Sequence, residues 1–356
     1  TGDAIGTGSL FINLIFVDFF FREDQSTKPG EVSGLFACFH SRSCNSSGKA
    51  NSTSQRSFKG QIYGRRVAVT GQSLDNLSRA LHGVGGRVEG QFGGVSVGEM
   101  IKALQRLGFD DAMEVSLGAD ATAYYEAQEA KEVAREGGHM TTSCCPAFYN
   151  MVAKHYPALL DKVSHTVSPM VATARFIKKK HPGAVVVFIE PCIAKKSEVK
   201  RYKDAGKIGA DYVLTFDELY AMFEAKHIDP EAIASRDVQQ GSKYGKNFAA
   251  AGGVTAAVQE VLAEEKFDMP VSCVKCSGAA ECKKALMLLR AGKLNETMIE
   301  GMVCEGGCVN GPAKITDPRE SLGMRRQLML GADDRSIADN LEMNDFKDID
   351  MKAGRM

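Results

Sequence analysis

Short apolar strands and amphipathic helices alternate along most of this 356-residue chain, and the alternation predicts an α/β fold with mainly parallel sheets. Residues 184–189, Ala-Val-Val-Val-Phe-Ile, form an unbroken apolar run, which is typical of a strand buried on both faces. Two of the three cysteine motifs directly follow predicted strands. Because parallel α/β folds bind ligands at the carboxyl ends of their strands, we expect these motifs to lie on ligand-binding loops.

The predicted elements begin with a capping box, Ser96-Val-Gly-Glu99, which opens a helix that ends at Gly108. Val97, Met100 and Leu104 share one face of this helix, so that face should be buried. The elements that follow are a strand at 112–117, a helix at about 120–135, a strand at 139–142, and helices at 147–156 and 169–180.

The second half continues the same alternation after the strand at 184–189. A strand at 211–214 leads into a second capping box, Thr215-Phe-Asp-Glu218, and Gly252-Gly253 opens a helix through Leu262. Two more strands, at 271–275 and 298–303, flank a helix at about 279–290. The charged tail, residues 314–356, is expected to form one or two surface helices and to carry no chemistry.

Composition excludes several classes of protein. The 44 Lys and Arg residues balance 44 Asp and Glu residues, so net charge gives no indication of nucleic acid or an anionic membrane as a partner. No apolar run reaches the roughly 18 residues that a membrane span needs. Ten cysteines are too few for a disulfide scaffold, and eight of them fall after residue 140 in short clusters. This pattern favours metal ligation in a reducing compartment.

The N-terminal 85 residues are read as a low-complexity extension. Residues 32–71 contain no Asp or Glu and many Ser, Asn and Thr, a composition that predicts disorder. The stretch has the basic, hydroxyl-rich character of an organelle transit peptide, although a linker or an incorrect gene start explains it equally well. The apolar run at residues 10–21 is a buried segment or, without a basic start, a weaker candidate for a signal sequence.

Three motifs supply the thiols of a candidate cluster. Cys304 and Cys308 flank two glycines, whose freedom lets the backbone turn tightly around an inorganic cluster. The other motifs are Thr142-Ser-Cys-Cys-Pro146, which contains Cys145, and the stretch Glu190-Pro-Cys-Ile-Ala-Lys-Lys-Ser-Glu198, which contains Cys192. Four thiolates are what a 4Fe–4S cubane requires. Such a cluster could also serve electron transfer or brace the fold.

In this order, T-S-C-C-P, P-C-x-x-K-x-x-E and C-x-G-G-C resemble the signature of the FeFe-hydrogenase family from about residue 90 to about residue 313. The resemblance implies an H-cluster domain at 86–313, built of two lobes with twisted, mainly parallel sheets and the cluster in the cleft between them. It also implies reversible reduction of protons to H2, a ferredoxin-like electron donor and dedicated maturation proteins. The expected location is the cytoplasm, or a hydrogenosome or plastid if the extension is a transit peptide. Without a C-x2-C-x2-C run, no accessory ferredoxin-like clusters are expected.

The resemblance also implies a cofactor of two parts, a 4Fe–4S cluster and a diiron subcluster with CO, CN− and a bridging dithiolate. Cys308 would bridge the two parts. By motif position, Lys195 would donate to a cyanide, Met302 and Phe248 would line the diiron pocket, and Pro191 would contact the cofactor. Without the resemblance, Lys195 in a Lys-Lys pair would be read as a solvated surface residue.

A proton route is implied by the same resemblance. Cys144, beside the ligand Cys145, would be the first protein relay, and Glu126, Ser164 and Glu129 would continue it. The two glutamates are three residues apart on one predicted helix and therefore share a face. A pair at this spacing is most often a solvated helix face.

Several residues depart from the family pattern. Gly85-Gly-Arg87 stands where a small-residue segment usually holds a cyanide, and Glu190 replaces a common Met and either faces the diiron unit or points away. Cys273, Cys276 and Cys282 have no counterpart, and we interpret them as structural, with a second metal site as the alternative. Two rival functions stay open: a hydrogenase-like iron–sulfur assembly protein without H2 activity, and a sensory hydrogenase.

Overall fold

The computed structural model describes residues 65–69, 97–229, 240–314, 330, 332–343 and 345–354. These residues belong to one compact unit that extends from Gly64 to Met356. The expectations for Ser96, for Gly85-Gly-Arg87 and for the N-terminal extension up to residue 64 lie outside the described residues. None of the helices in the described part of the chain is long and apolar enough to cross a membrane.

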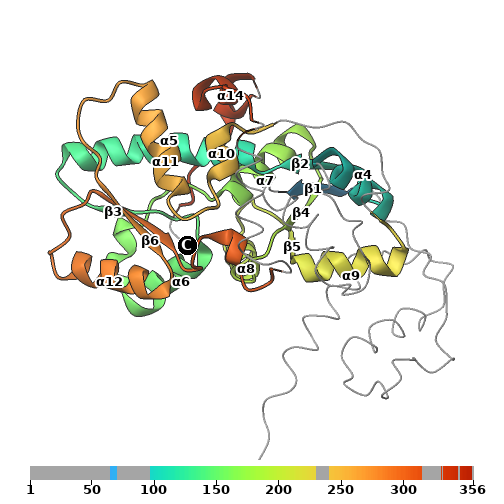
Figure 1. The fold of residues 1–356 in the computed structure, drawn as a ribbon, viewed down its shortest axis with the longest axis horizontal. Helices are drawn as coiled ribbons and strands as arrows, with labels where there is room; N and C mark the ends of the chain where they lie inside the picture. Colours follow the sequence, from blue (N-terminus) through green and yellow to red (C-terminus); the bar gives the residue numbers. More distant parts are fainter. Residues whose placement is uncertain are drawn as a thin grey trace, which may run out of the picture. The chain divides into compact units, whose positions relative to one another are not determined.

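The first sheet has four parallel strands in the order β2-β1-β4-β5 (Figure 1). Its strands are β1 (Arg65–Val69), β2 (Asp111–Glu114), β4 (Val185–Ile189) and β5 (Tyr212–Leu214). Composition predicted disorder over residues 32–71, and this prediction is wrong for β1. The five-residue strand pairs with β2 on one side and β4 on the other, so tertiary pairing overrides the local composition.

The second sheet has three parallel strands in the order β3-β7-β6. Its strands are β3 (Met140–Thr141), β7 (Met298–Met302) and β6 (Cys273–Ser277), and all five residues of the central β7 are buried. The α/β prediction with parallel sheets flanked by helices is therefore confirmed.

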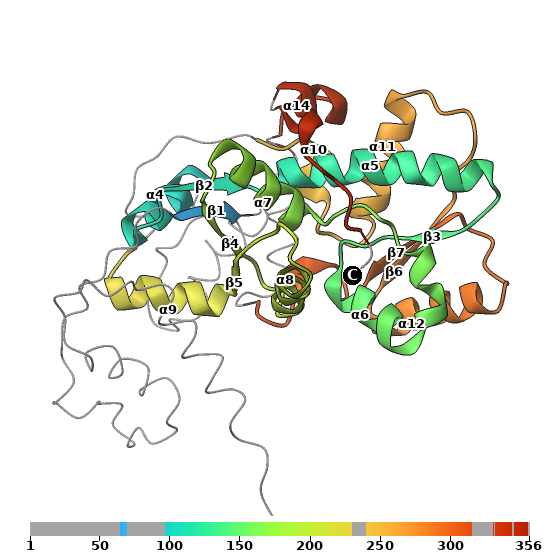
Figure 2. The same cartoon turned by 180° about the vertical axis from the view of Figure 1, so that it is seen from behind.

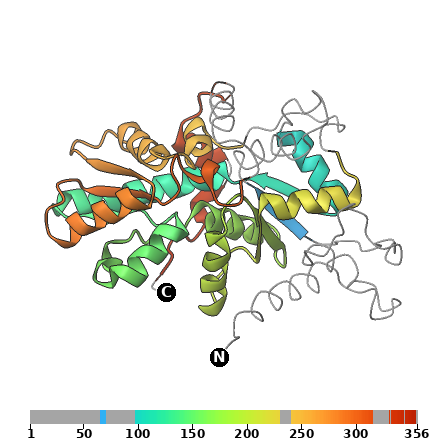
Figure 3. The ribbon, with the colours of Figure 1, turned by 60° about the horizontal axis from the view of Figure 1, so that its bottom comes forward.

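Helix α5 (Ser116–Arg135) follows β2 of the first sheet and precedes β3 of the second, and it extends alongside both sheets (Figures 1 and 3). The sequence predicted that a strand would continue to residue 117, and this is wrong beyond Glu114. Val115 and Leu117 alternate as in a strand, but the first turn of α5 buries both residues. A Cβ on Gly118 would lie 2.2 Å from Thr173 Oγ1, so α5 and α7 (Pro169–Lys180) approach closely there.

The remaining helices cover the two sheets largely as predicted. The capping box at Thr215 is confirmed, with both reciprocal hydrogen bonds present. Two helices, α8 and α10, were not predicted from the sequence. The bounds are α4 (Val97–Leu107), α6 (Pro146–His155), α8 (Ala194–Asp204), α9 (Phe216–Lys226), α10 (Lys243–Asn247), α11 (Gly253–Glu264) and α12 (Ala279–Arg290), with 3-10 turns η1 (Pro157–Lys162) and η2 (Cys308–Asn310).

The described part of the C-terminal tail forms a helix at the surface, as predicted, and its buried face also completes the core. It forms α14 (Ile337–Met343), which packs against α5 and α11, and the turn η3 (Phe346–Asp348) (Figure 2). Ile337 and Leu341 are buried, and Phe346 stacks on Phe176 with ring centroids 4.4 Å apart. Widely spaced apolar residues among many charges hid an amphipathic helix that completes the core.

Candidate active site

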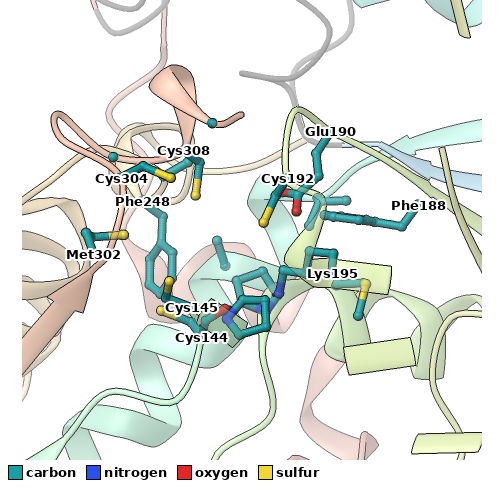
Figure 4. Close-up of a pocket in the computed structure, with 18 of the residues that line it drawn as sticks. Cys144, Cys145, Phe188, Glu190, Cys192, Lys195, Phe248, Met302, Cys304 and Cys308 are labelled. Atoms are coloured by element: carbon teal, nitrogen blue, oxygen red, sulfur yellow. Dashed lines mark hydrogen bonds between the residues drawn. The ribbon is translucent and has the colours of Figure 1, made fainter. Parts of the chain in front are cut away.

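Loops at the carboxyl ends of strands from both sheets converge on one cavity. Cys144 and Cys145 follow β3, Cys192 follows β4, and Cys304 and Cys308 follow β7. All five thiols line this cavity, and Figure 4 shows the sulfur atoms of the labelled cysteines around a common space. The structure thus brings together the full set of thiols that the sequence singled out.

The C-x-G-G-C loop is held against the chain that precedes α11. Gly306 and Gly307 have φ angles of +78° and +99°, which L side chains rarely adopt. A Cβ on Gly307 would lie 2.4 Å from the Ala249 carbonyl oxygen. That same carbonyl accepts a hydrogen bond from the backbone N–H of Cys308 at 2.8 Å. Gly306 is therefore required for the backbone turn, and Gly307 for both the turn and the close approach that positions Cys308.

The buried cysteine thiols of the cavity resist ionisation. Burial raises the pKa of the Cys192 and Cys308 thiols well above the usual range, and the neighbouring Glu190 raises both further. Metal binding must therefore displace protons from buried thiols, as thiolate ligation of an iron–sulfur cluster does.

Lys195 is a buried cation in the cavity wall and not a solvated surface residue. Its side chain is 7% exposed, and its Nζ donates to the Cys144 carbonyl oxygen at 3.1 Å and to Glu198 at 2.7 Å. Burial opposes its charge, but Glu198 and Glu190 outweigh this effect and raise the pKa above its ordinary value. The ammonium is thus kept charged beside the thiols.

Of the three other predicted cofactor contacts, two line the cavity and one does not. Met302 and Phe248 line the cavity and are almost fully buried. Pro191 is not among the described residues that line the cavity, and its contact with a cofactor stays a prediction. Its carbonyl oxygen instead accepts a hydrogen bond from Ala313 N–H at 3.0 Å, and a Cβ on Gly311 would lie 2.4 Å from that oxygen. Pro191 therefore fixes the chain that follows Cys308.

Cys144 and Glu126 form the inner part of a polar row. Burial raises the pKa of Cys144 well above the usual range, and Glu126 raises it further. Glu126 is fully buried; its Oε1 accepts from Ser143 N–H at 3.3 Å, and its Oε2 has no partner in the described part of the chain. Burial and the nearby Glu129 raise the pKa of Glu126 to about 8. Both groups therefore hold protons at neutral pH.

The outer part of the row reaches the surface. Ser164 is buried near Glu126, and its Oγ accepts from Thr166 N–H at 3.1 Å. Glu129 accepts from Thr166 Oγ1 at 2.6 Å and from the backbone N–H of His165 at 2.9 Å. The His165 side chain is 62% exposed. Thr166 and His165 were missed in the sequence, because neither belongs to a recognisable motif.

Glu190 faces the cavity and does not point away. It lines the cavity wall, and its carboxyl lies beside Cys192 in Figure 4. It is 4% exposed, its Oε1 has no partner among the described residues, and burial raises its pKa to about 7. The departure from the family pattern at this position thus adds a polar group to the cavity.

The thiols outside the cavity lie in an apolar layer. Cys276 and Cys282 are buried with Phe148 and Leu286, and Cys282 Sγ donates to the Met302 carbonyl oxygen at 3.5 Å. Cys273 is half-buried at the start of β6. These contacts support the structural interpretation of the three residues.

The parallel sheets and the cysteine-lined cavity at their strand ends define a protein that holds an iron–sulfur group. The family model for "Iron only hydrogenase large subunit, C-terminal domain" matches residues 83–312, and the chain belongs to this family.

Two of the similar proteins are named iron hydrogenases. Iron hydrogenase 1 of Clostridium pasteurianum is 29% identical over 264 residues, which are 62% of this chain and 46% of that protein. The periplasmic Fe hydrogenase large subunit of Nitratidesulfovibrio vulgaris is 31% identical over 270 residues, which are 64% of either chain. The match thus spans about half to two-thirds of these relatives.

Solved structures support the fold. The FeFe-hydrogenase HydA from a study of stepwise H-cluster assembly has a TM-score of 0.62 at 21% identity and covers 81% of this chain and 89% of its own. HydA1 of Chlamydomonas reinhardtii, in a variant form, has a TM-score of 0.56 at 20% identity and covers 81% and 90%.

Proposed function

We propose that this chain is an FeFe hydrogenase that reduces protons reversibly to H2. The observation that carries the proposal is Cys144. A 4Fe–4S cubane needs four thiolates, and Cys144 is a fifth thiol on the same cavity, beside the buried carboxyl group of Glu126. Neither a structural cubane nor an assembly protein requires a protonated thiol beside a buried carboxyl group.

The residues present fit the proposed cofactor. Cys145, Cys192, Cys304 and Cys308 would hold the 4Fe–4S cluster, and Cys308 would also hold a diiron unit with CO, CN− and a dithiolate. Lys195 would donate to an anionic ligand of that unit, and Met302 and Phe248, with the other apolar residues of the wall, would exclude water from it. When bound, this group would transfer electrons between the redox partner and the metal site at which H2 is made or split.

Proton transfer would be the task of the protein. Cys144 carries a proton at Sγ at the cavity wall, and Glu126 is the next group that can take or return it. Glu126 is protonated below about pH 8, and its Oε2 is free to turn toward a new partner. Ser164 and Glu129 then continue the row to the exposed His165.

Electron supply and maturation follow from the same proposal. A ferredoxin-like protein would supply electrons to the 4Fe–4S cluster, and maturation proteins would install the diiron unit. The sensory alternative is favoured by one observation, the carboxyl group of Glu190 in the cavity, because a polar group there differs from the usual Met.

Turnover tests the proposal directly. Protein loaded with the 4Fe–4S cluster and the diiron unit should evolve H2 from protons when reduced methyl viologen is the electron donor. It should also consume H2 when oxidised methyl viologen is the electron acceptor. Cys145→Ala, treated identically, is the control and should do neither. A fully loaded wild-type protein that evolves no H2 would favour the assembly protein, and slow turnover in both directions would favour the sensor.

A further inference from the structure

Residues 351–353 of the C-terminal tail, hereafter the tail segment, lie beside residues 165–167 in an antiparallel bridge. The second of these stretches carries His165 and Thr166, which belong to the outer part of the polar row. Figure 2 shows the tail, in red, running from the region of α14 to the point marked C. The polar row is thus in contact with a part of the chain that contains none of the cysteine motifs.

Thr166 connects the two halves of the polar row. Its Oγ1 donates to Glu129 Oε1 at 2.6 Å, and its backbone N–H donates to Ser164 Oγ at 3.1 Å. Its carbonyl oxygen accepts from Ser143 Oγ at 2.6 Å, and the backbone N–H of Ser143 donates to Glu126. Thr166 is 3% exposed. The position of this one residue therefore sets the geometry of both the outer and the inner groups.

The tail segment fixes the backbone on both sides of Thr166. The backbone N–H of Val167 donates to the Met351 carbonyl oxygen at 2.8 Å. The backbone N–H of Ala353 donates to the His165 carbonyl oxygen at 2.6 Å. Each peptide unit is rigid, and a residue turns only about the two dihedral angles between its neighbouring units. Holding both neighbouring units therefore restricts the orientation of Thr166.

The tail segment is itself anchored to the main fold. Arg175, on α7, donates from Nη1 to the Lys352 carbonyl oxygen at 3.0 Å. Lys207 donates from Nζ to the Ala353 carbonyl oxygen at 2.7 Å. Met351 is 3% exposed, so its side chain adds apolar burial to these polar contacts. The segment can therefore act as a support for the residues that it contacts.

We propose that the tail segment is a positioning element for proton transfer and that it acts through Thr166. It holds the Thr166 hydroxyl on Glu129 and the Thr166 N–H on Ser164, so that these two groups stay connected through one residue. A proton passes between two groups only where they are within hydrogen-bond reach. The purpose of the positioning rests on the proposed function, whereas the positioning itself rests on the contacts above.

Amide hydrogen exchange of the full chain, with only the 4Fe–4S cluster loaded, tests the positioning. Ala353→Pro removes the N–H that donates to His165. Lys352→Pro is the matched control, because the Lys352 N–H donates to Asp350 Oδ1 within the tail. We expect the His165 and Val167 amides to exchange about 10-fold faster in Ala353→Pro, as for loss of one hydrogen bond, and at the wild-type rate in the control. Equal exchange in the two variants would overturn the positioning.

Turnover of the fully loaded protein tests the purpose of the positioning. Ala353→Pro should retain its iron and the infrared bands of bound CO and CN−, while its H2 evolution falls about 10-fold, because misplaced groups transfer protons slowly. The ratio of its rates in H2O and D2O should rise, since proton transfer along the row then limits turnover. Lys352→Pro should match wild type in each measurement. Loss of iron and bands in proportion to activity would overturn the proposal, because the tail segment would then only stabilise the fold.

A double-mutant cycle tests the route through Thr166. Thr166→Val keeps the shape of the side chain but removes the hydroxyl that bonds to Glu129, and Thr166→Ser keeps a hydroxyl. We expect Thr166→Val to lower H2 evolution about 10-fold, Thr166→Ser to retain most of it, and Ala353→Pro to cause no further loss in the Thr166→Val protein. Additive losses would overturn the route through Thr166. If amide exchange changes as expected but loaded wild type evolves no H2, the positioning stands and the hydrogenase proposal fails.

Discussion

The described residues contain two sets of thiols, and the surroundings of these sets differ. One set lies on loops that follow β3, β4 and β7 and faces a cavity. The other, Cys273, Cys276 and Cys282, lies within β6 and α12, where two of the three are buried in apolar packing. Side chains three residues apart on a strand point to opposite faces, so the C-x2-C spacing of Cys273 and Cys276 cannot chelate one metal. The spacing of cysteines therefore acquires meaning from the element that carries them.

The largest expected difference between the two sets of thiols is the effect of a substitution on iron content. Cys145→Ala removes one of the four proposed cubane ligands, so iron per chain after anaerobic reconstitution should fall close to zero. Iron and acid-labile sulfide are measured beside Cys282→Ala, which is the matched buried thiol outside the cavity and should load normally. Equal iron loss in both variants would erase the distinction between the sets.

Cys144 lines the cavity, but we predict that it is not a ligand of the cluster. Cys144→Ala should load normal iron and lower H2 evolution about 100-fold or more, as loss of a positioned acid does. Cys144→Asp should recover part of the activity, because it restores a group that can carry a proton. If iron instead falls as far as in Cys145→Ala, Cys144 is a ligand and its role as a relay is wrong.

Stability should respond most to Cys282, the most deeply buried member of the second set. Cys282 is fully buried and bonded to the Met302 carbonyl oxygen, so Cys282→Ala should lower the free energy of unfolding by about 1–2 kcal/mol. Denaturant unfolding of the apoprotein measures this change. A loss of iron larger than the loss of folded protein would indicate a metal role for this thiol.

The smallest effect is expected at Cys273. This residue is half-buried, and its Sγ contacts the Val271 carbonyl oxygen at a long 3.6 Å. Cys273→Ala should change the free energy of unfolding by no more than about 0.5 kcal/mol and leave iron content unchanged. A larger change in either quantity would mean that the second set acts as a unit.

The sequence was informative where local rules decide the structure. The boundaries of α7 and α12 were predicted correctly, because proline or glycine begins each helix and the apolar period is regular. The start of α5 was misread, because burial of Val115 and Leu117 depends on helix packing and not on alternation.

In the site, too, some residues could be predicted from local motifs and others only from the fold. Motifs identified the thiols and Lys195, but Lys246 and Thr166 reach the cavity or the polar row through contacts across the fold. Glu190 could be noticed in the sequence, yet its orientation depends on how β4 ends beside Cys192.

The central claim is that Cys308 holds both the cubane and a diiron unit, whereas Cys304 holds the cubane alone. The measurement is the infrared spectrum of wild type and Cys308→Ser, matured side by side, together with iron per chain and H2 output. Bound CO and CN− absorb where the polypeptide does not, so wild type should show their bands. Cys308→Ser should lose the bands and all turnover, because the diiron unit loses its one thiolate tether. Equal bands in both proteins would contradict the bridging role, and their absence from competently matured wild type would contradict the hydrogenase assignment.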